Sequence, residues 1–233
     1  MKHHRMIFII FSIVALLFVI NSALIFAEQK KSQGDNEVIF QWSFGSIKNT
    51  TSGPQFKIVS RDTTLKSGDQ IKFFLKLSHS CFVYLIYQSS QEEVSVLFPY
   101  RFKQSAKDYK VSGNHYIPKG NQWFELDEYT GLEKFYLLAS TERLYEIETL
   151  VNKYESADKT KKSVFGQKII AQIRSLRKKH LKFKTYAEKP VTVIGNMRGT
   201  DKTKAVGLND LADHAVEISA SNFFSRTYTI DHQ

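Results

Sequence analysis

A dense run of cationic side chains is the most pointed chemical feature of this 233-residue chain. No acidic residue occurs between Lys159 and Tyr186, and apolar residues recur three and four positions apart in this stretch. The cations would therefore occupy one side of an amphipathic helix. That helix could lie on an anionic membrane surface, or dock its apolar side on the protein and offer its basic side to an acidic partner. A solvated face that only covers the core is the third interpretation. The candidate contact residues are Lys168, Arg174, Arg177, Lys178, Lys179, Lys182 and Lys184.

The densest acidic group is Glu125, Asp127, Glu128 and Glu133. A glycosidase needs two carboxylates that face each other across a cleft. Strand alternation would place Glu125 and Asp127 on one face, about 7 Å apart. A charged strand edge that prevents aggregation is the alternative interpretation.

Carboxylates and imidazoles also gather near the C-terminus, where Asp210, Asp213 and His214 form one group and His232 follows Asp231. Side chains of this kind at helical spacing can bind a divalent ion. Helix capping and surface charge explain them equally well, and no fourth ligand stands at a diagnostic spacing. The sequence therefore predicts no metal and no cofactor.

The single cysteine, Cys81, cannot form an intramolecular disulfide and lies in an apolar run, which predicts a small buried hydrophobe. Aromatic residues could form a sugar-binding platform, although such residues more often fill β cores. The glycines at 195 and 199 lack the Gly-Lys-Ser/Thr ending of a phosphate loop, and no Gly-x-Ser-x-Gly motif occurs. No catalytic motif is present, so we do not expect an enzyme. The platform candidates are Trp42, Tyr84, Tyr87, Tyr100, Tyr109, Tyr116 and Trp123.

Short apolar or alternating runs bounded by turn residues predict a mainly β fold. Leu144, Ile147, Val151 and Tyr154 change the period to that of a helix over 142–155, with Ser140 or Thr141 as its cap. Further helices are expected at 164–180 and, briefly, 208–214. The expected strands are 38–44 (closed by Gly45), 55–60, 71–77, 81–87, 94–98, a hairpin of 109–111 with 115–117, 123–126, 134–139, 190–194 and 224–230.

The first 27 residues have the pattern of an export signal. Met1–Arg5 carries two firm positive charges, no charged residue occurs from Met6 to Ile20, and Ala27 precedes a polar start. We expect cleavage after Ala27, followed by a flexible leader at 28–36. Residues 6–27 are also long enough to span a bilayer, so a retained inner-membrane anchor that contacts the membrane is the alternative. The expected location is periplasmic or secreted.

Export decides how the charge is interpreted. The signal holds two of the 33 Lys and Arg residues and none of the 23 acids, so the mature chain carries +8 instead of +10. This balance favours an envelope protein, anionic lipid or acidic polysaccharide as partner, and nucleic acid is not expected outside the cytoplasm. Charge that serves only solubility is the alternative.

The stretch from about Thr64 to Leu144 resembles a bacterial family known only as domain of unknown function 4384. The resemblance implies a compact β-rich accessory module of envelope or signalling proteins, without assigned catalytic residues. The helices within 142–182 and the last strand would be additions to that module. The matching motifs, in order, are Gly68-Asp69, Val83-Tyr84-Leu85, Leu97-Phe98-Pro99, Tyr116-Ile117-Pro118, Gly131-Leu132-Glu133 and Ala139-Ser140.

Together these features predict an α+β, mainly β chain: an antiparallel β-sandwich-like domain at 37–233 with a two-helix insertion at 142–182 and a C-terminal strand, behind an N-terminal signal helix. The expected function is an exported, non-catalytic binding or assembly module of the bacterial cell envelope that contacts an acidic partner through the basic helix. Two alternatives stay open. One is a hydrolase of envelope polymer that uses Glu125 or Asp127, and the other is a membrane-tethered structural protein.

Overall fold

A computed structural model describes residues 37–77, 81–100, 113–180, 186–190 and 208–233. The expected signal helix and leader lie outside these residues, as do Lys182 and Lys184 of the basic run. Among the residues described, no helix is both long and apolar enough to cross a membrane.

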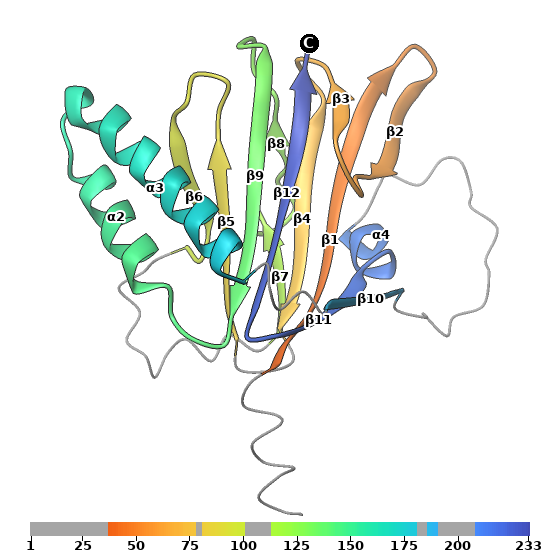
Figure 1. Cartoon of the computed structure of the whole chain (residues 1–233). Coiled ribbons are helices and arrows are strands. Elements are labelled where there is room, and N and C mark those ends of the chain that lie inside the picture. The colour runs from red at the N-terminus through yellow and green to blue at the C-terminus, as the bar shows by residue number, and fades with distance from the viewer. Residues whose placement is uncertain (1–36, 78–80, 101–112, 181–185, 191–207) are drawn as a thin grey trace, which may run out of the picture. The chain divides into compact units, whose positions relative to one another are not determined.

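Two β-sheets form the architecture, which confirms the mainly β prediction (Figure 1). The first sheet, sheet A, has the order β10-β11-β1-β4-β7, with β2 paired to β1 and β8 paired to β4. Its strands are β1 (Glu37–Thr50), β2 (Gly53–Ile58), β4 (Gln70–Leu77), β7 (Gly113–Ile117), β8 (Phe124–Glu125), β10 (Tyr186–Pro190) and β11 (Val216–Ser221).

The second sheet, sheet B, has the order β3-β12-β9-β5-β6. The short β3 runs parallel to β12, and the other pairs are antiparallel. The expected C-terminal strand is therefore an internal strand of this sheet. The strands are β3 (Thr63–Leu65), β5 (Phe82–Gln88), β6 (Val94–Phe98), β9 (Gly131–Ser140) and β12 (Phe223–His232).

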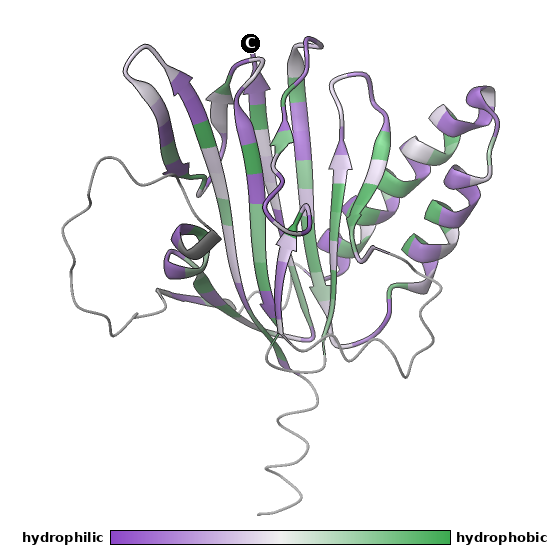
Figure 2. Ribbon diagram, turned by 180° about the vertical axis from the view of Figure 1, so that it is seen from behind, coloured by the Kyte–Doolittle hydropathy of each residue, from purple (hydrophilic) through white to green (hydrophobic). Residues whose placement is uncertain are grey.

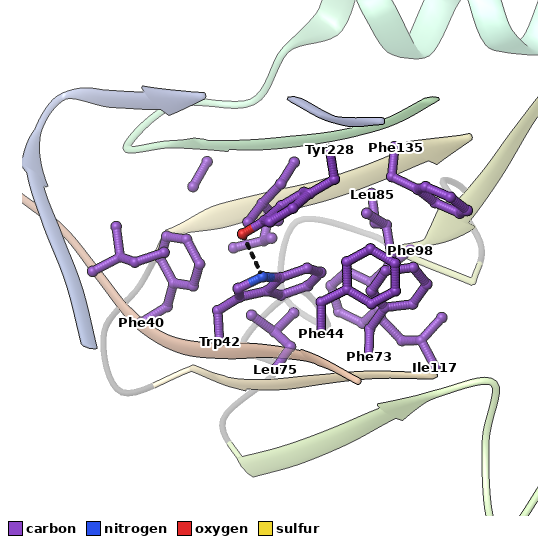
Figure 3. Packing of buried hydrophobic residues seen from close by; sticks show 14 of the residues in the cluster. Phe40, Trp42, Phe44, Phe73, Leu75, Leu85, Phe98, Ile117, Phe135 and Tyr228 are labelled. Carbon is purple, nitrogen blue, oxygen red and sulfur yellow. Dashed lines mark hydrogen bonds between the residues drawn. The ribbon is translucent and has the colours of Figure 1, made fainter. Parts of the chain in front are cut away.

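The main core lies between the two sheets and is rich in aromatic rings (Figure 3). The ring centroids of Phe44 of β1 and Phe73 of β4 are 4.3 Å apart, and the ring centroid of Phe135 of β9 lies 5.2 Å from that of Phe73. The indole N–H of Trp42 donates to the hydroxyl of Tyr228 over 2.8 Å, so the polar atom of the buried tryptophan is satisfied. These contacts join sheet A to sheet B.

The helical insertion packs on the outer face of sheet B, as Figure 1 shows. It consists of α2 (Tyr145–Glu155) and α3 (Lys159–His180). Alternate residues of β5 and β9, such as Tyr84 and Leu138, contact the helices, while their neighbours face the main core. Burial on both faces explains why the amino-acid sequences of these strands are nearly continuous runs of apolar residues. A third helix, α4 (Leu208–Asp213), lies against sheet A.

The predicted cap of the first helix is wrong. Ser140 is the last residue of β9, and α2 begins after Leu144 without a side-chain cap. The hydroxyl of Tyr84 instead accepts the Leu144 N–H over 3.1 Å and donates to Oε1 of the buried Glu148 over 2.6 Å. Arg143 pairs with the same carboxylate. A strand residue thus anchors the start of this helix.

Two predicted turns are also strand. Gly45 does not end β1 but lies in its middle, where a Cβ atom would come within 2.6 Å of side-chain atoms of Leu211 and Phe56. Glycine at this position permits the close approach of α4 to the sheet. Gly113 and Asn114, expected in a hairpin turn, belong to β7, which pairs with β4. Residues 109–111 of that hairpin lie outside the described part.

Candidate functional site

The basic side of α3 is exposed, and its apolar side is buried. Ile169, Ile170 and Ile173 are at most 4% exposed in the cluster with sheet B. The apolar stripe is therefore packed against sheet B within the protein, which fits both a helix that offers its basic side to a partner and a solvated helix that only covers the core. Five described cations remain on exposed positions: Lys168, Arg174, Arg177, Lys178 and Lys179.

These five cations are not equivalent. Arg177 donates from a guanidinium nitrogen to the Thr227 hydroxyl of β12 over 3.0 Å, so it is held at the edge of the helix–sheet contact. Lys168 and Lys179 are 11 residues apart, about three helical turns, and so point the same way. Arg174 and Lys178 are four residues apart and form the adjacent row. The outward face is therefore made by these four residues.

The acidic group does not form the facing pair that a glycosidase would need. Strand β8 ends at Glu125, so the strand alternation that was to align Glu125 with Asp127 is absent. Both side chains are exposed, and neither lines the pocket described below. The amide of Gln70 donates to Glu125 over 3.4 Å, and Asp127 accepts the Tyr129 N–H over 2.8 Å.

The Asp210–His214 group does not converge either. His214 hydrogen-bonds through Nδ1 to the Asp210 carbonyl oxygen at 2.7 Å, which is a local contact at the end of α4. His232 behaves differently. It is 1% exposed, and its Nδ1 lies 3.2 Å from Oε1 of Glu133, which is 4% exposed. Two residues from separate sequence groups thus meet inside the protein.

Strand alternation explains this meeting. On β9 the residues Phe135 and Leu137 face the main core, so Glu133 continues the same face. On β12 the core residues Tyr228 and Ile230 place His232 on that face as well. Because Ile230 pairs with Glu133, the imidazole and the carboxylate are diagonal neighbours at one end of sheet B.

The turn before β4 completes this cluster. Ser67 Oγ lies 3.1 Å from His232 Nε2, and the Ser67 N–H donates to the Gln233 carbonyl over 3.2 Å. The buried carboxylate of Asp69 accepts the N–H groups of Lys66 and Asn49, at 2.9 and 2.8 Å. The Gly68-Asp69 motif therefore builds a turn that holds the end of β12.

Ser67, His232 and Glu133 lie in the order of a Ser-His-acid triad. A triad also needs N–H donors for the oxyanion of the tetrahedral intermediate. The nearest candidates are engaged elsewhere, since the Ser67 N–H binds Gln233 and the Gly68 N–H donates to the Leu126 carbonyl over 2.8 Å. The hydrogen-bonded chain alone therefore gives no ground for assigning acyl-transfer chemistry.

A pocket of about 610 Å³ opens between the sheets, beside β1 and β12. Its charged walls are compensated within the protein. Arg226 forms an ion pair with Glu188 of β10, and Asp62 accepts the Thr229 N–H over 3.1 Å. Burial acts to lower the pKa of Arg226, but the hydrogen bonds and charge interactions with Glu188 and Tyr228 together outweigh it, and the pKa is raised. Arg226 and Glu188 thus pair with each other across the pocket, while Arg61 and Asp62 also line it.

The aromatic candidates and the cysteine belong mainly to the core. Trp42 and Tyr84 are buried, which removes them from any surface platform, and Tyr109 lies outside the described residues. Tyr100 is exposed, and its hydroxyl donates to the Tyr116 carbonyl over 2.7 Å. Cys81 is 3% exposed, and burial raises the pKa of its thiol to about 11, as expected of a buried hydrophobe.

Comparison with known proteins finds a family match for one part of the chain. No curated protein and no solved structure matches it. The family match spans about a third of the chain and ends before α2. The helices α2 and α3 and the strands β10–β12 therefore lie outside the matched region. Residues 64–143 of this chain are a domain of the family described as Domain of unknown function (DUF4384).

Proposed function

We propose that the chain is an exported, non-catalytic binding or assembly module of the bacterial cell envelope, which contacts an acidic partner through α3. The observation that carries the proposal is the orientation of this helix. Its isoleucines are buried against sheet B, while the solvent-exposed side carries Lys168, Arg174, Lys178 and Lys179. A helix that served only to cover the core would need polar residues on this side but not one sign of charge.

The length of the helix favours an extended acidic surface as the partner. Its 22 residues span about 33 Å, and its last turn carries only basic residues. Cations near the C-terminal end are also stabilised by the helix dipole, so the positive charge costs the fold little. An envelope protein, an anionic lipid surface or an acidic polysaccharide would fit. Lipid contact through α3 would involve headgroups alone, because the apolar stripe is buried.

Charge reversal tests this proposal. In the triple variant Arg174→Glu, Lys178→Glu and Lys179→Glu, we expect binding to the acidic partner to weaken by roughly 100-fold, since each cation near an anionic surface contributes about 1 kcal/mol. The matched control reverses three exposed lysines elsewhere, Lys57, Lys76 and Lys189, with the same change in net charge. Equal loss in both variants would show that only net charge matters and would contradict a contact through α3.

Three binding assays distinguish the partner classes. Co-sedimentation with phosphatidylglycerol vesicles, compared with phosphatidylcholine vesicles, reports lipid binding. Retention by an acidic polysaccharide resin reports polymer binding, and pull-down from a detergent-solubilised envelope fraction reports a protein. N-terminal sequencing of the purified protein decides between the cleaved module and the membrane-tethered alternative, in which residues 6–27 are still present.

A further inference from the structure

Three side chains that can each ligate a metal converge at the end of sheet B. Glu133 comes from β9, His232 comes from β12, and Asp127 comes from the segment between β8 and β9. One ligating atom from each residue lies within 4.8 Å of those of the other two. Ligand atoms around one ion at 2.0–2.2 Å are roughly 3–4 Å apart, so small side-chain movements would close this group on an ion.

The charges of this group are not balanced by lysine or arginine. In the described part of the chain, neither Asp127 nor Glu133 forms an ion pair with either residue type, and the neighbour of Glu133 is the imidazole of His232, 3.2 Å away. Glu133 is almost fully buried, and a buried carboxylate needs a compensating charge. The nearby Asp127 adds a like charge, which a divalent cation would neutralise.

The surrounding hydrogen bonds suit a metal ligand. If His232 donates its Nε2 proton to Ser67 Oγ, its Nδ1 lone pair faces the Glu133 carboxylate at 3.2 Å. In this tautomer the two lone pairs can be bridged by a proton or by a metal ion, and a divalent ion would use both as ligands. Tyr87 lies close enough to hydrogen-bond the Glu133 carboxylate. Ser67 and Tyr87 would then orient the two ligands, as the outer partners of metal ligands commonly do.

We propose that Asp127, Glu133 and His232 bind a divalent transition metal ion, of which Zn²⁺ fits the donor set best. An imidazole with two carboxylates suits zinc, whereas calcium and magnesium prefer oxygen ligands. Three protein ligands leave one position for water or an external ligand. The ion would also join β9, β12 and the segment after β8, so its binding should stabilise the folded protein.

Calorimetric titration of the metal-free purified protein with zinc chloride tests the proposal. We expect one saturable site per chain and an affinity at least tenfold weaker in Asp127→Asn and Glu133→Gln. Tyr87→Phe should weaken binding by about 10- to 100-fold through the orientation of Glu133. Calcium chloride should bind far more weakly. Matched controls are Glu125→Gln and His214→Asn, an exposed acid and an exposed histidine outside the cluster, which should bind zinc as the unchanged protein does.

Absence of saturable zinc binding would overturn the proposal, as would equal loss in the control variants. If Glu133→Gln does not fold, Asp127→Asn decides, because Asp127 is exposed and its substitution removes no core contact. A second readout is the thermal midpoint, which should rise with zinc in the unchanged protein and stay constant in Asp127→Asn. This result is independent of α3, whose variants should keep zinc binding.

Discussion

Lys72 shows how strongly a single residue can depend on its surroundings. It lies on β4 with a fully buried side chain, and its ammonium donates to the Pro118 carbonyl over 2.9 Å, to the Gly120 carbonyl over 2.8 Å and to the Gln122 carbonyl. These carbonyls belong to the segment between β7 and β8, so one lysine fastens that segment to sheet A. Burial lowers the pKa of Lys72 to about 8 from 10.5.

Replacement of Lys72 by methionine should reduce the free energy of unfolding by about 1–3 kcal/mol at pH 7, because buried carbonyls lose their donors. The difference should depend on pH. Between about pH 8 and 10.5 the unfolded chain keeps the Lys72 proton that the folded chain releases, so the contribution of Lys72 to stability rises with pH. Urea denaturation of both proteins at pH 7, 8.5 and 10 measures this. If the difference in unfolding free energy between the unchanged protein and Lys72→Met narrows as the pH rises, the lowered pKa of Lys72 in the folded protein is contradicted.

Gly45 offers a second test at the residue scale. Gly45→Ala places a methyl group within 2.6 Å of Leu211 and Phe56, and relief of this overlap should cost about 1–3 kcal/mol of unfolding free energy. Gly53→Ala is not a suitable control, because Gly53 has a positive φ of 107°. Ser175→Ala on the exposed side of α3 is suitable and should change stability little. Equal thermal midpoints for all three proteins would mean that α4 does not approach β1 as closely as described.

The sequence predicts the burial of apolar residues but not the burial or the partners of polar ones such as Lys72 and Glu133. The apolar run around Cys81 predicted burial correctly because burial depends on local composition. The contact between Glu133 and His232 joins residues 99 positions apart. The contact follows from the register of β9 against β12, and that register cannot be predicted from the local sequence pattern of either strand. In the sequence the two residues therefore belong to different groups.

At the scale of elements, periodicity predicted the two inserted helices, and their boundaries were less accurate. The second helix begins at Lys159 instead of Val164, because residues 159–163 carry no apolar signal although they are helical. The first helix lacks the expected cap because β9 extends through Ser140. The sequence predicts a strand end at Gly45, since glycine usually weakens strands. Its role depends on α4, which is more than 160 residues away in sequence.

The attachment of α3 to sheet B makes a prediction at this scale. Ile173→Ala should lower the free energy of unfolding by about 2–5 kcal/mol, because the residue is fully buried between the helix and the sheet. Ser175→Ala, two positions along on the exposed side, is the matched control. Chemical denaturation followed by circular dichroism gives both values. A cost below about 1 kcal/mol for Ile173→Ala would mean that the helix is loosely attached and that its apolar side is available to other surfaces.

At the scale of the whole molecule, the β-sandwich and the inserted helices have different roles. The two sheets enclose an aromatic core, and the inserted helices cover the outer face of sheet B. Figure 2 shows that the ribbons of these helices carry both hydrophilic and hydrophobic stretches. The DUF4384 region supplies β4 to β9, and the strands outside the match complete both sheets. The exposed basic side of α3 therefore lies on an element outside the matched region. Under the proposed function, specificity for a partner would reside in this element.

The most direct test of the central claim is a photo-crosslinking comparison on the full-length protein in its native envelope. A diazirine side chain placed at Lys178 should crosslink to an acidic envelope component, and high salt should abolish the product because exposed charge contacts are screened. The same group at Lys57 of β2, an exposed lysine on another element, should give no such product. Crosslinks from Lys57 without any from Lys178 would contradict a contact through α3.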